Sequence, residues 1–321
     1  MTYSEKYADF PAYILGVTRE IWEDRGVGTL NDTYAPDIVV RSPMGIQRGN
    51  QAVIASTLAT IHEFPDRQLY GEDVIWSNDP EHGHLSSHRL ITTATHARDG
   101  QFGPATHARW TVRVIADCAA RGEQIYDEWL VRDYGGIVRA LGKDPRDFAA
   151  GLIDAEGGPS AAAKPFTPKD DIDGGYHGRG NDHPRGASYA ETLRRIMDKD
   201  FAHVMRDYDR AVIGEYAGGL TTLGLEESVG FWIGLRSSFP TADFAIHHHI
   251  GMEGDMLSPR ASIRWSLDGT HDGWGAFGRP TGARVHVMGL AHAEYGPWGL
   301  RREFALYDEV AIWKQILMAG G

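Results

Sequence analysis

An internal repeat constrains this chain more than any other feature of its sequence. The segment FGPATHAR at 102–109 returns as FGRPTGAR at 277–284, so Phe277 lies 175 residues after Phe102. This offset holds from about residue 49 to residue 133, and a one-residue slip upstream matches Tyr34 with Tyr208. Other pairs at the offset are Gly49 with Gly224, Ser87 with Ser262, Arg89 with Arg264, Glu128 with Glu303, and Asp133 with Asp308. A register this long predicts two copies of one domain.

The junction between the copies is visible in the composition. From Gly157 the sequence reads GGPSAAAKPFTPKDDIDGGYHGRGNDHPRG, which is rich in Gly, Pro and Asp and lacks apolar periodicity. Such a segment is typical of a linker that is extended where its prolines lie. We therefore expect a first domain at 1–150, a linker at 151–186 and a second domain at 187–321.

Composition excludes several classes of partner. The chain has 32 basic and 44 acidic side chains and a net charge of −12, which argues against binding to a phosphate backbone. It contains no apolar run near the roughly 18 residues of a membrane span. The N-terminus MTYSEKYADF does not resemble a signal peptide, and the single Cys118 fits a reducing compartment. We expect a cytoplasmic protein that binds neither nucleic acid nor membrane.

Each copy shows helices first and strands afterwards. Apolar residues at helical spacing predict a helix after Asp9, and a second helix is expected from Asn50, as its cap, to a stop at Pro65. Alternating patterns then predict strands at 73–77, 84–96, 108–117 and 124–133. Copy 2 repeats this order, with its first helix expected at 193–205. The pattern predicts an α+β fold in which a curled sheet wraps over helices and encloses an apolar cone.

Two segments resemble a known family. RWSLDGTHDGWGAFGRPTGARVHVMG at 264–289 is similar to the hallmark of SnoaL-like polyketide cyclases, within the NTF2-like superfamily, and so is the tail DYGGIVRALGKDP at 133–145. The resemblance implies two tandem cone domains, each with N-terminal helices on a curved antiparallel sheet. It also implies a small hydrophobic or aromatic ligand and no metal or organic cofactor. Since such domains commonly pair through their sheets, the two copies are expected to form an intramolecular pseudo-dimer, with a homodimer of chains as a further expectation.

The chemistry of the family does not transfer directly. The resemblance implies an Asp on the last strand and a His on the strand before it. These positions hold Leu130 and Ala116 in copy 1, and Ala305 and Ala291 in copy 2. Asp117 and His292 lie one residue away, where a strand side chain points to the opposite face. Any acid/base chemistry therefore needs other residues.

Two carboxylates shared by the copies are the main catalytic candidates. Strand alternation directs Glu303, like Glu128 in copy 1, into the apolar cone, where burial raises the pKa of a carboxylate toward a useful range. The alternative is a structural ion pair with an arginine. Tyr216 beside Glu303 would resemble the ketosteroid isomerase arrangement, in which a phenol stabilises an enolate, or would simply be a core tyrosine. Copy 2 keeps the fuller motif, so its cone is the expected site.

Histidines and aromatic residues supply the remaining candidates. His96 and His271 form a second shared pair that either relays a proton or caps a strand end. The candidate substrate-binding residues, with a purely structural core as the alternative, are Trp232, Trp265, Trp274, Phe277 and Tyr307. In His247-His248-His249 only the outer two share a strand face, and we expect no metal site.

Two functions remain open at this stage. One is cofactor-free acid/base chemistry (cyclisation, isomerisation or dehydration) on a small hydrophobic carbonyl compound. The other is non-catalytic binding of a small molecule in the cones. Separately, Arg89 with Asp133 and Arg264 with Asp308 are interpreted as a structural salt bridge repeated in each copy.

Overall fold

The computed structural model describes residues 6–320 and contains two similar halves. The helices and strands of the first half are α1 (Phe10–Trp22), α2 (Leu30–Thr33), β1 (Tyr34–Ser42), β2 (Gly45–Arg48), α3 (Asn50–Glu63), β3 (Gln68–Asp79), β4 (Gly83–Thr95), β5 (Arg109–Arg121), β6 (Gln124–Arg132), α4 (Tyr134–Ala140) and α5 (Pro145–Ala155). Those of the second half are α6 (Pro184–Met197), α7 (Phe201–Asp207), β7 (Tyr208–Tyr216), β8 (Leu220–Leu223), α8 (Leu225–Ser238), β9 (Asp243–Gly254), β10 (Leu257–Thr270), β11 (Arg284–Gly296), β12 (Gly299–Tyr307) and α9 (Glu309–Met318).

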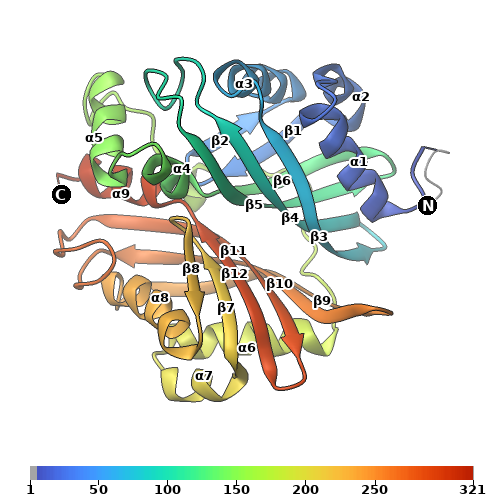
Figure 1. The fold of residues 1–321 in the computed structure, drawn as a ribbon, viewed down its shortest axis with the longest axis vertical. Coiled ribbons are helices and arrows are strands. Elements are labelled where there is room, and N and C mark those ends of the chain that lie inside the picture. Colours follow the sequence, from blue (N-terminus) through green and yellow to red (C-terminus); the bar gives the residue numbers. More distant parts are fainter. Residues whose placement is uncertain (1–5, 321) are drawn as a thin grey trace.

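Each half is built on a six-stranded sheet. The strand orders are β2-β1-β6-β5-β4-β3 and β8-β7-β12-β11-β10-β9, so the two sheets have one topology. All neighbouring strands are antiparallel except β1 with β6 and β7 with β12, which are parallel. In Figure 1 the two sheets face each other, with α1–α3 covering the outer face of the first and α6–α8 covering that of the second. The predicted α+β class, with two tandem cone domains, is confirmed.

The structure also locates the one-residue slip in the repeat. Strands β1 and β7 begin at Tyr34 and Tyr208, whereas β2 and β8 begin at Gly45 and Leu220. The turn from β1 to β2 has two residues between the strands, and the turn from β7 to β8 has three. The extra residue therefore lies in the β7–β8 turn.

Two of the predicted helices need correction, at Asn50 and at 193–205. The first helix needs none, because the Asp9 carboxylate caps α1 by accepting a hydrogen bond from the Ala12 amide at 2.8 Å. Asn50, however, is the first residue of α3; Gly49 is the cap, and the Asn50 side chain donates to the Tyr34 carbonyl instead. The helix expected at 193–205 is two helices, α6 and α7, because Asp200 caps a new helix.

Apolar side chains form one layer of the contact between the sheets. This layer contains Ile115, Val131, Phe166, Met288, Leu290, Phe304 and Leu306, all buried. The last helix adds a second connection: α9, which follows the second sheet, packs against α4 and α5 of the first half. The Lys314 ammonium on α9 also lies 2.7 Å from a Glu156 carboxylate oxygen just after α5. The halves are thus joined by their sheets and by this helix.

The segment between the halves packs against both sheets. Helix α5 ends at Ala155 and α6 begins at Pro184. Between them, Arg41 on β1 hydrogen-bonds to the Asp171 carboxylate and to the Ile172 carbonyl. On the other side, the Tyr176 hydroxyl lies 2.8 Å from His248 Nε2 of the second sheet. The segment is extended only in part, because Pro159 lies in a turn and Pro168 begins a short 3₁₀ helix, Pro168–Asp170. Polar contacts fix it in place.

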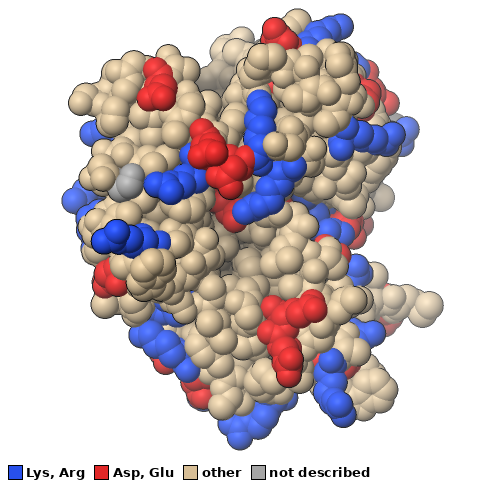
Figure 2. Space-filling model, turned by 60° about the vertical axis from the view of Figure 1, so that its left-hand side comes forward, with Lys and Arg blue, Asp and Glu red and all other residues tan. Residues whose placement is uncertain are grey.

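The outer surface has mixed charge. On the face drawn in Figure 2, Lys and Arg side chains lie among Asp and Glu side chains. The acidic excess is therefore interspersed with basic groups on this face. Within residues 6–320, none of the helices is both long enough and apolar enough to span a bilayer.

Candidate functional site

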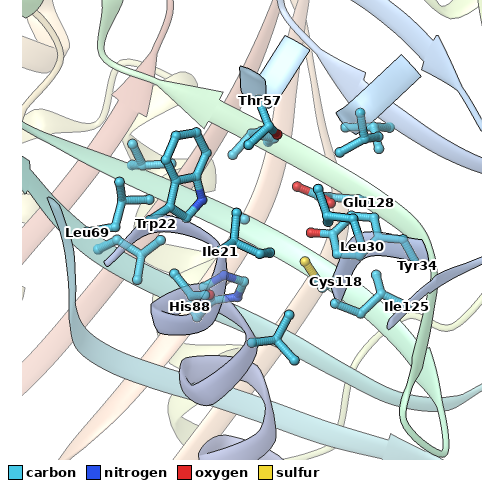
Figure 3. A pocket seen from close by; sticks show the side chains of 18 of the residues that line it. Ile21, Trp22, Leu30, Tyr34, Thr57, Leu69, His88, Cys118, Ile125 and Glu128 are labelled. Atoms are coloured by element: carbon cyan, nitrogen blue, oxygen red, sulfur yellow. The ribbon is translucent and has the colours of Figure 1, made fainter. Parts of the chain in front are cut away.

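A cavity of about 80 Å³ lies inside the cone of the first half. Helices α1 and α3 and strands β1, β4, β5 and β6 supply its walls, and Figure 3 shows polar atoms of Glu128, Tyr34, Cys118 and His88 among apolar side chains. A larger cleft of about 470 Å³ adjoins it and shares Trp22, Gln47, Ser56, Thr57 and Arg132 as lining residues. Arg132 therefore lies where the cavity meets the cleft.

The strand register arranges the cavity floor in three rows. From the cleft inward, the rows across β4, β5 and β6 are Leu90-Val114-Arg132, His88-Ala116-Leu130 and Ser86-Cys118-Glu128. All of these residues except Ser86 line the cavity. Ala116 and Leu130, the positions at which the family resemblance implies His and Asp, thus face the cavity with apolar side chains. His88 occupies the neighbouring strand in their own row.

Glu128 is a buried carboxylate at the inner end of this floor. Burial raises its pKa to about 7, and this rise is opposed by the charge of Arg132 and by the Tyr34 hydroxyl and Cys118 thiol, which donate toward it. Within residues 6–320 it has no cationic side chain within ion-pairing distance. A group with this pKa can both accept and return a proton near neutral pH.

The other polar groups of the cavity are neutral near pH 7 or are cationic. Burial lowers the pKa of His88 to about 4, and its Nδ1 lies 3.1 Å from the Ser86 hydroxyl. Where the Ser86 hydroxyl donates to Nδ1 rather than to the Cys118 carbonyl, which lies 3.5 Å away, the imidazole proton is on Nε2. Burial also raises the pKa values of Tyr34 and Cys118 well above their usual range. Among the described residues the Arg132 guanidinium has no hydrogen-bond partner, so its donors are available to a ligand.

The cone of the second half is organised differently around its own carboxylate. Glu303 is fully buried and accepts hydrogen bonds from the Tyr216 hydroxyl at 2.6 Å and the Trp232 indole at 3.0 Å. The hydroxyls of Tyr189 and Tyr208 donate to it at 2.9 Å as well. Burial raises the pKa of Glu303, and these four donors oppose the rise. The predicted neighbours Tyr216, Glu303 and Trp232 are therefore together, in an interior that side chains occupy.

Substitutions at matching positions explain the difference between the cones. The floor of the second cone reads Trp265-Gly289-Tyr307, Ile263-Ala291-Ala305 and Ala261-Ala293-Glu303. His88 and Arg132 thus correspond to Ile263 and Tyr307. A Cβ on Gly289 would lie 2.1 Å from the Trp265 ring, so glycine is what allows this indole to fill the cone. The copies share the carboxylate; in the first it lines a cavity, and in the second it is enclosed by four hydrogen-bond donors.

The remaining candidates lie away from both carboxylates. His96 and His271 begin the loops after β4 and β10, where their backbone amides bond to Ala108 and Ala283 and their Nδ1 atoms lie 3.1 Å from threonine hydroxyls. This placement favours the structural interpretation. Phe277 is buried against Trp313, whereas Trp274 is 69% exposed at the surface.

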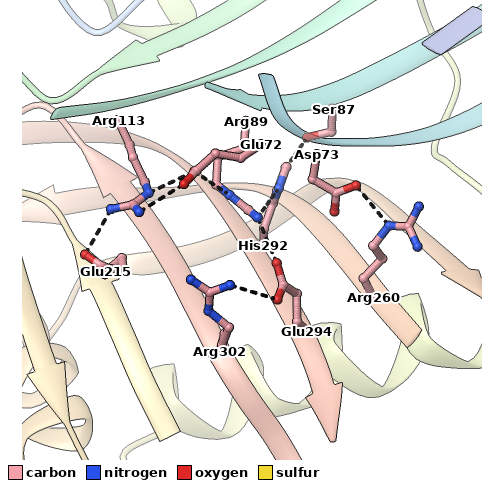
Figure 4. A network of polar contacts seen from close by, with 10 residues as sticks. All are labelled: Glu72, Asp73, Ser87, Arg89, Arg113, Glu215, Arg260, His292, Glu294 and Arg302. Atoms are coloured by element: carbon pink, nitrogen blue, oxygen red, sulfur yellow. Dashed lines mark hydrogen bonds and ion pairs between the residues drawn. The ribbon is translucent and has the colours of Figure 1, made fainter. Parts of the chain in front are cut away.

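The face between the sheets holds the off-register residues. His292 lies 2.9 Å from the Ser87 hydroxyl, and Asp117 pairs with Arg264 at 3.1 Å, so both point away from the cones as the register predicts (Figure 4 draws the His292 contacts).

The proposed Arg89–Asp133 and Arg264–Asp308 bridges are wrong. Arg89 contacts Glu72 on the neighbouring strand β3 and Glu294 on β11 of the other sheet, and the two aspartates instead cap α4 and α9.

The histidine triplet also has protein partners. His247 Nε2 lies 2.8 Å from the Ser266 hydroxyl, and His248 bonds to Tyr176. Within residues 6–320 there is no group of three or more His, Cys, Asp or Glu side chains placed to hold a metal ion.

Sequence reasoning did not identify several polar residues of the first cavity as site residues, among them Tyr34, Arg67 and His88. The signal was present in the repeat. Positions at which the copies agree, such as Glu128 and Glu303, carry residues that both domains keep. At positions where they differ, such as His88 and Ile263, one copy has a polar group that the fold does not require. Comparing the differences at the offset would have directed attention to the first copy.

The raised pKa of Glu128 has a measurable consequence for stability. Between about pH 4.5 and pH 7 the folded carboxyl stays protonated while the unfolded one ionises, so the native state binds more protons and stability falls as pH rises. Glu128→Gln removes this effect. We subtract the unfolding free energy of wild type from that of the variant at each pH. This difference should be about 3 kcal/mol larger at about pH 8 than at about pH 4. Urea unfolding at several pH values measures this; a difference that is constant over pH would contradict the burial of an ionisable Glu128.

Comparison with known proteins gives matches in structure alone. No protein-family model and no curated protein matches the sequence. The structure of IdmH from Streptomyces antibioticus, provisionally described as a polyketide cyclase, is 21% identical, with a TM-score of 0.36, over 40% of this chain and 96% of that one. A similarly described SnoaL-like polyketide cyclase from Jannaschia sp. CCS1 is 19% identical, with a TM-score of 0.36, over 42% and 96%. One from Acidithiobacillus ferrooxidans is 19% identical, with a TM-score of 0.37, over 44% and 98%. Over 40–44% of its residues, the length of one half, this chain is thus similar to solved structures described as polyketide cyclases, the Jannaschia protein as SnoaL-like.

Proposed function

We propose that the first half carries out cofactor-free acid/base chemistry on a small carbonyl compound in the cavity around Glu128. The observation that carries this proposal is a buried carboxylate with a pKa of about 7 that lines a cavity and forms no ion pair within the described chain. Structural carboxylates in interiors are normally paired or fully hydrogen-bonded, as Glu303 is. Perturbed groups that line a cavity are candidates for catalysis.

The floor of the cavity suggests a division of roles. The Glu128 carboxylate removes a proton from the carbon next to the substrate carbonyl, and the electron pair moves onto the carbonyl oxygen. The Nε2 proton of neutral His88 then hydrogen-bonds to the developing enolate. The proton returns from Glu128 to the same or another carbon, or the enolate attacks a second carbonyl. Return of the proton to another carbon is an isomerisation, and attack on a second carbonyl of the same molecule, whose alkoxide then takes the proton from Glu128, is a cyclisation. In a dehydration the enolate instead expels a β-hydroxyl group, which takes that proton and leaves as water.

Arg132 indicates the kind of substrate. It lies four residues from Glu128 on the same face of β6, which places their Cα atoms about 13 Å apart along the strand. Its guanidinium is suited to a carboxylate or another oxygen-rich group at the mouth. The apolar residues between them, Ala116 and Leu130, would contact the body of the substrate. We therefore propose an apolar-bodied carbonyl compound with an anionic or oxygen-rich end. In this proposal the second half serves as the structural partner.

Hydrogen exchange at carbon tests the chemistry directly. Small ketones and keto acids are incubated with the protein in heavy water, and loss of the α-proton signal is followed by NMR. Wild type should accelerate exchange of at least one compound, and Glu128→Gln should reduce this rate by at least about 100-fold, because the base is lost. Glu303→Gln, the equivalent change in the other copy, is the matched control and should keep the rate if the variant remains folded. An equal loss in both variants would contradict the proposal.

The alternative function is binding without catalysis. It is favoured by the apolar residues at positions 116 and 130, where the resemblance implies an acid/base pair. Carbonyl compounds that bind saturably but exchange no proton in wild type would support this alternative and reject the catalytic one.

A further inference from the structure

A second cavity, of about 260 Å³, lies between the two sheets beneath the connecting segment. This volume approaches the lower end of the range for small-molecule pockets, roughly 300–1,000 Å³. Trp129 on β6 forms one wall, and Arg264, Ser266, His286 and Met288 on β10 and β11 form the floor. The connecting segment closes the cavity with residues from Phe166 to Arg179. The cavity exists only because the two halves and the segment meet.

The walls of this cavity are mainly aromatic. Trp129 and Tyr176 meet edge to face with ring centroids 6.1 Å apart, and Phe166 packs against the His286 ring at 5.7 Å. Pro168 and Met288 complete the apolar lining. Aromatic walls of this kind favour a planar apolar body, which can contact ring edges and faces.

The charged groups favour an anion at the rim. Arg264 is 6% exposed, and one of its donors binds Asp117 while its guanidinium lies over the Trp129 ring. Arg179, at the rim, has no carboxylate partner within residues 6–320; the one hydrogen bond of its side chain there is to the His247 carbonyl at 3.4 Å. The carboxylate that also lines the cavity, Asp171, is already paired with Arg41. Arg179 is therefore the lining cation whose charge the protein leaves unbalanced.

Neutral hydrogen-bonding groups lie between these charges. The His247 side chain is linked to the Ser266 hydroxyl at 2.8 Å, and both line the cavity. Burial lowers the pKa of His247 to about 4; the charges of Arg264, His286 and Arg179 act in the same direction and that of Asp171 opposes them, so the field at this imidazole is on balance positive. A carboxylate near His247 and Arg179 would satisfy this field.

From this arrangement we infer that the cavity between the sheets is a second ligand site, specific for a small planar aromatic carboxylate whose ring lies among Trp129, Phe166 and Tyr176 and whose carboxylate is bound by Arg179 and the floor of β10. This site is separate from the cone cavity, because the two have no lining residue in common. It does not depend on the chemistry proposed for Glu128.

Calorimetric titration with benzoate tests this site. Wild type should bind saturably, and Arg179→Ala and Phe166→Ala should each weaken binding at least about tenfold, because the first removes the anion partner and the second an aromatic wall. Both residues lie in the connecting segment, and their main-chain hydrogen bonds, from the Phe166 amide to the Pro43 carbonyl and from the His249 amide to the Arg179 carbonyl, do not involve the side chains that are removed. Each variant is checked for an unchanged circular dichroism spectrum. Glu128→Gln, in the cone cavity, is the matched control and should leave benzoate binding unchanged.

Three results would overturn the inference. No binding of benzoate to wild type would remove the site. Binding that is lost in Glu128→Gln but kept in Arg179→Ala would place the ligand in the cone instead. Equal affinity for benzyl alcohol, which has the same ring and no charge, would exclude an anion-specific site.

Discussion

Glu303→Ala is expected to lower the unfolding free energy by at least about 4 kcal/mol. The carboxylate is the shared acceptor for four buried donors: the hydroxyls of Tyr189, Tyr208 and Tyr216, and the indole of Trp232. Alanine leaves all four without this partner, and each unsatisfied buried group costs about 1–3 kcal/mol. The desolvation of the buried carboxyl group, which alanine avoids, offsets part of this loss. Since whole domains are stable by only about 5–15 kcal/mol, the second half should become marginal or unfold.

The first half provides the matched control for this prediction. Glu128→Ala removes the corresponding carboxylate from a cavity, where Tyr34 and Cys118 are its partners and water can replace it. We expect a change of less than about 1.5 kcal/mol, and at high pH a stabilisation. Urea denaturation followed by circular dichroism at about pH 7 compares the two variants. If Glu303→Ala cost no more than Glu128→Ala, the four donors would not depend on the carboxylate.

The contrast between these residues shows what the sequence could predict. The offset of 175 residues directs Glu128 and Glu303 to the same place in two cones, and the structure has them in equivalent rows. Their environments depend on neighbours from other elements: Tyr189 and Trp232 come from α6 and α8, and no local pattern shows that they converge on Glu303. Strand periodicity predicts which face of the sheet a side chain lies on. Which other side chains pack against that face depends on tertiary structure.

The fold itself was predictable because each helix and strand pattern occurs in both copies of the repeat. Helix and strand order, the cone architecture and the turn slip all follow from local signals present in both copies. Asn50 shows where local signals fail. Asparagine is a preferred N-cap residue, but the cap of α3 is the preceding Gly49, whose φ of +83° is a conformation that suits glycine. Polar contacts between elements, such as those of Arg89 with Glu72 and Glu294, have no counterpart in local patterns.

The connecting segment shows the same limit, since its composition predicts a linker and says nothing of what holds it. Arg41 binds the Asp127 carboxylate, the Asp171 carboxylate and the Ile172 carbonyl at once. The second oxygen of Asp127 accepts the Tyr176 amide at 3.1 Å. One buried ion pair therefore fixes both ends of the stretch 171–176 to the first sheet. A planar guanidinium can serve three acceptors in this way.

We expect Arg41→Met to destabilise the protein by about 3–5 kcal/mol, because it leaves the Asp127 carboxylate buried, 1% exposed, without its cation. The segment should also detach, so trypsin should cleave after Lys169 and Arg179 faster than in wild type. Arg41→Lys should give an intermediate result, since one ammonium cannot reach all three acceptors. The double variant Arg41→Met with Asp127→Asn separates the two causes: it removes the uncompensated charge and should recover part of the stability, while the segment stays susceptible to trypsin. Wild-type resistance to trypsin in Arg41→Met would show that packing alone holds the segment.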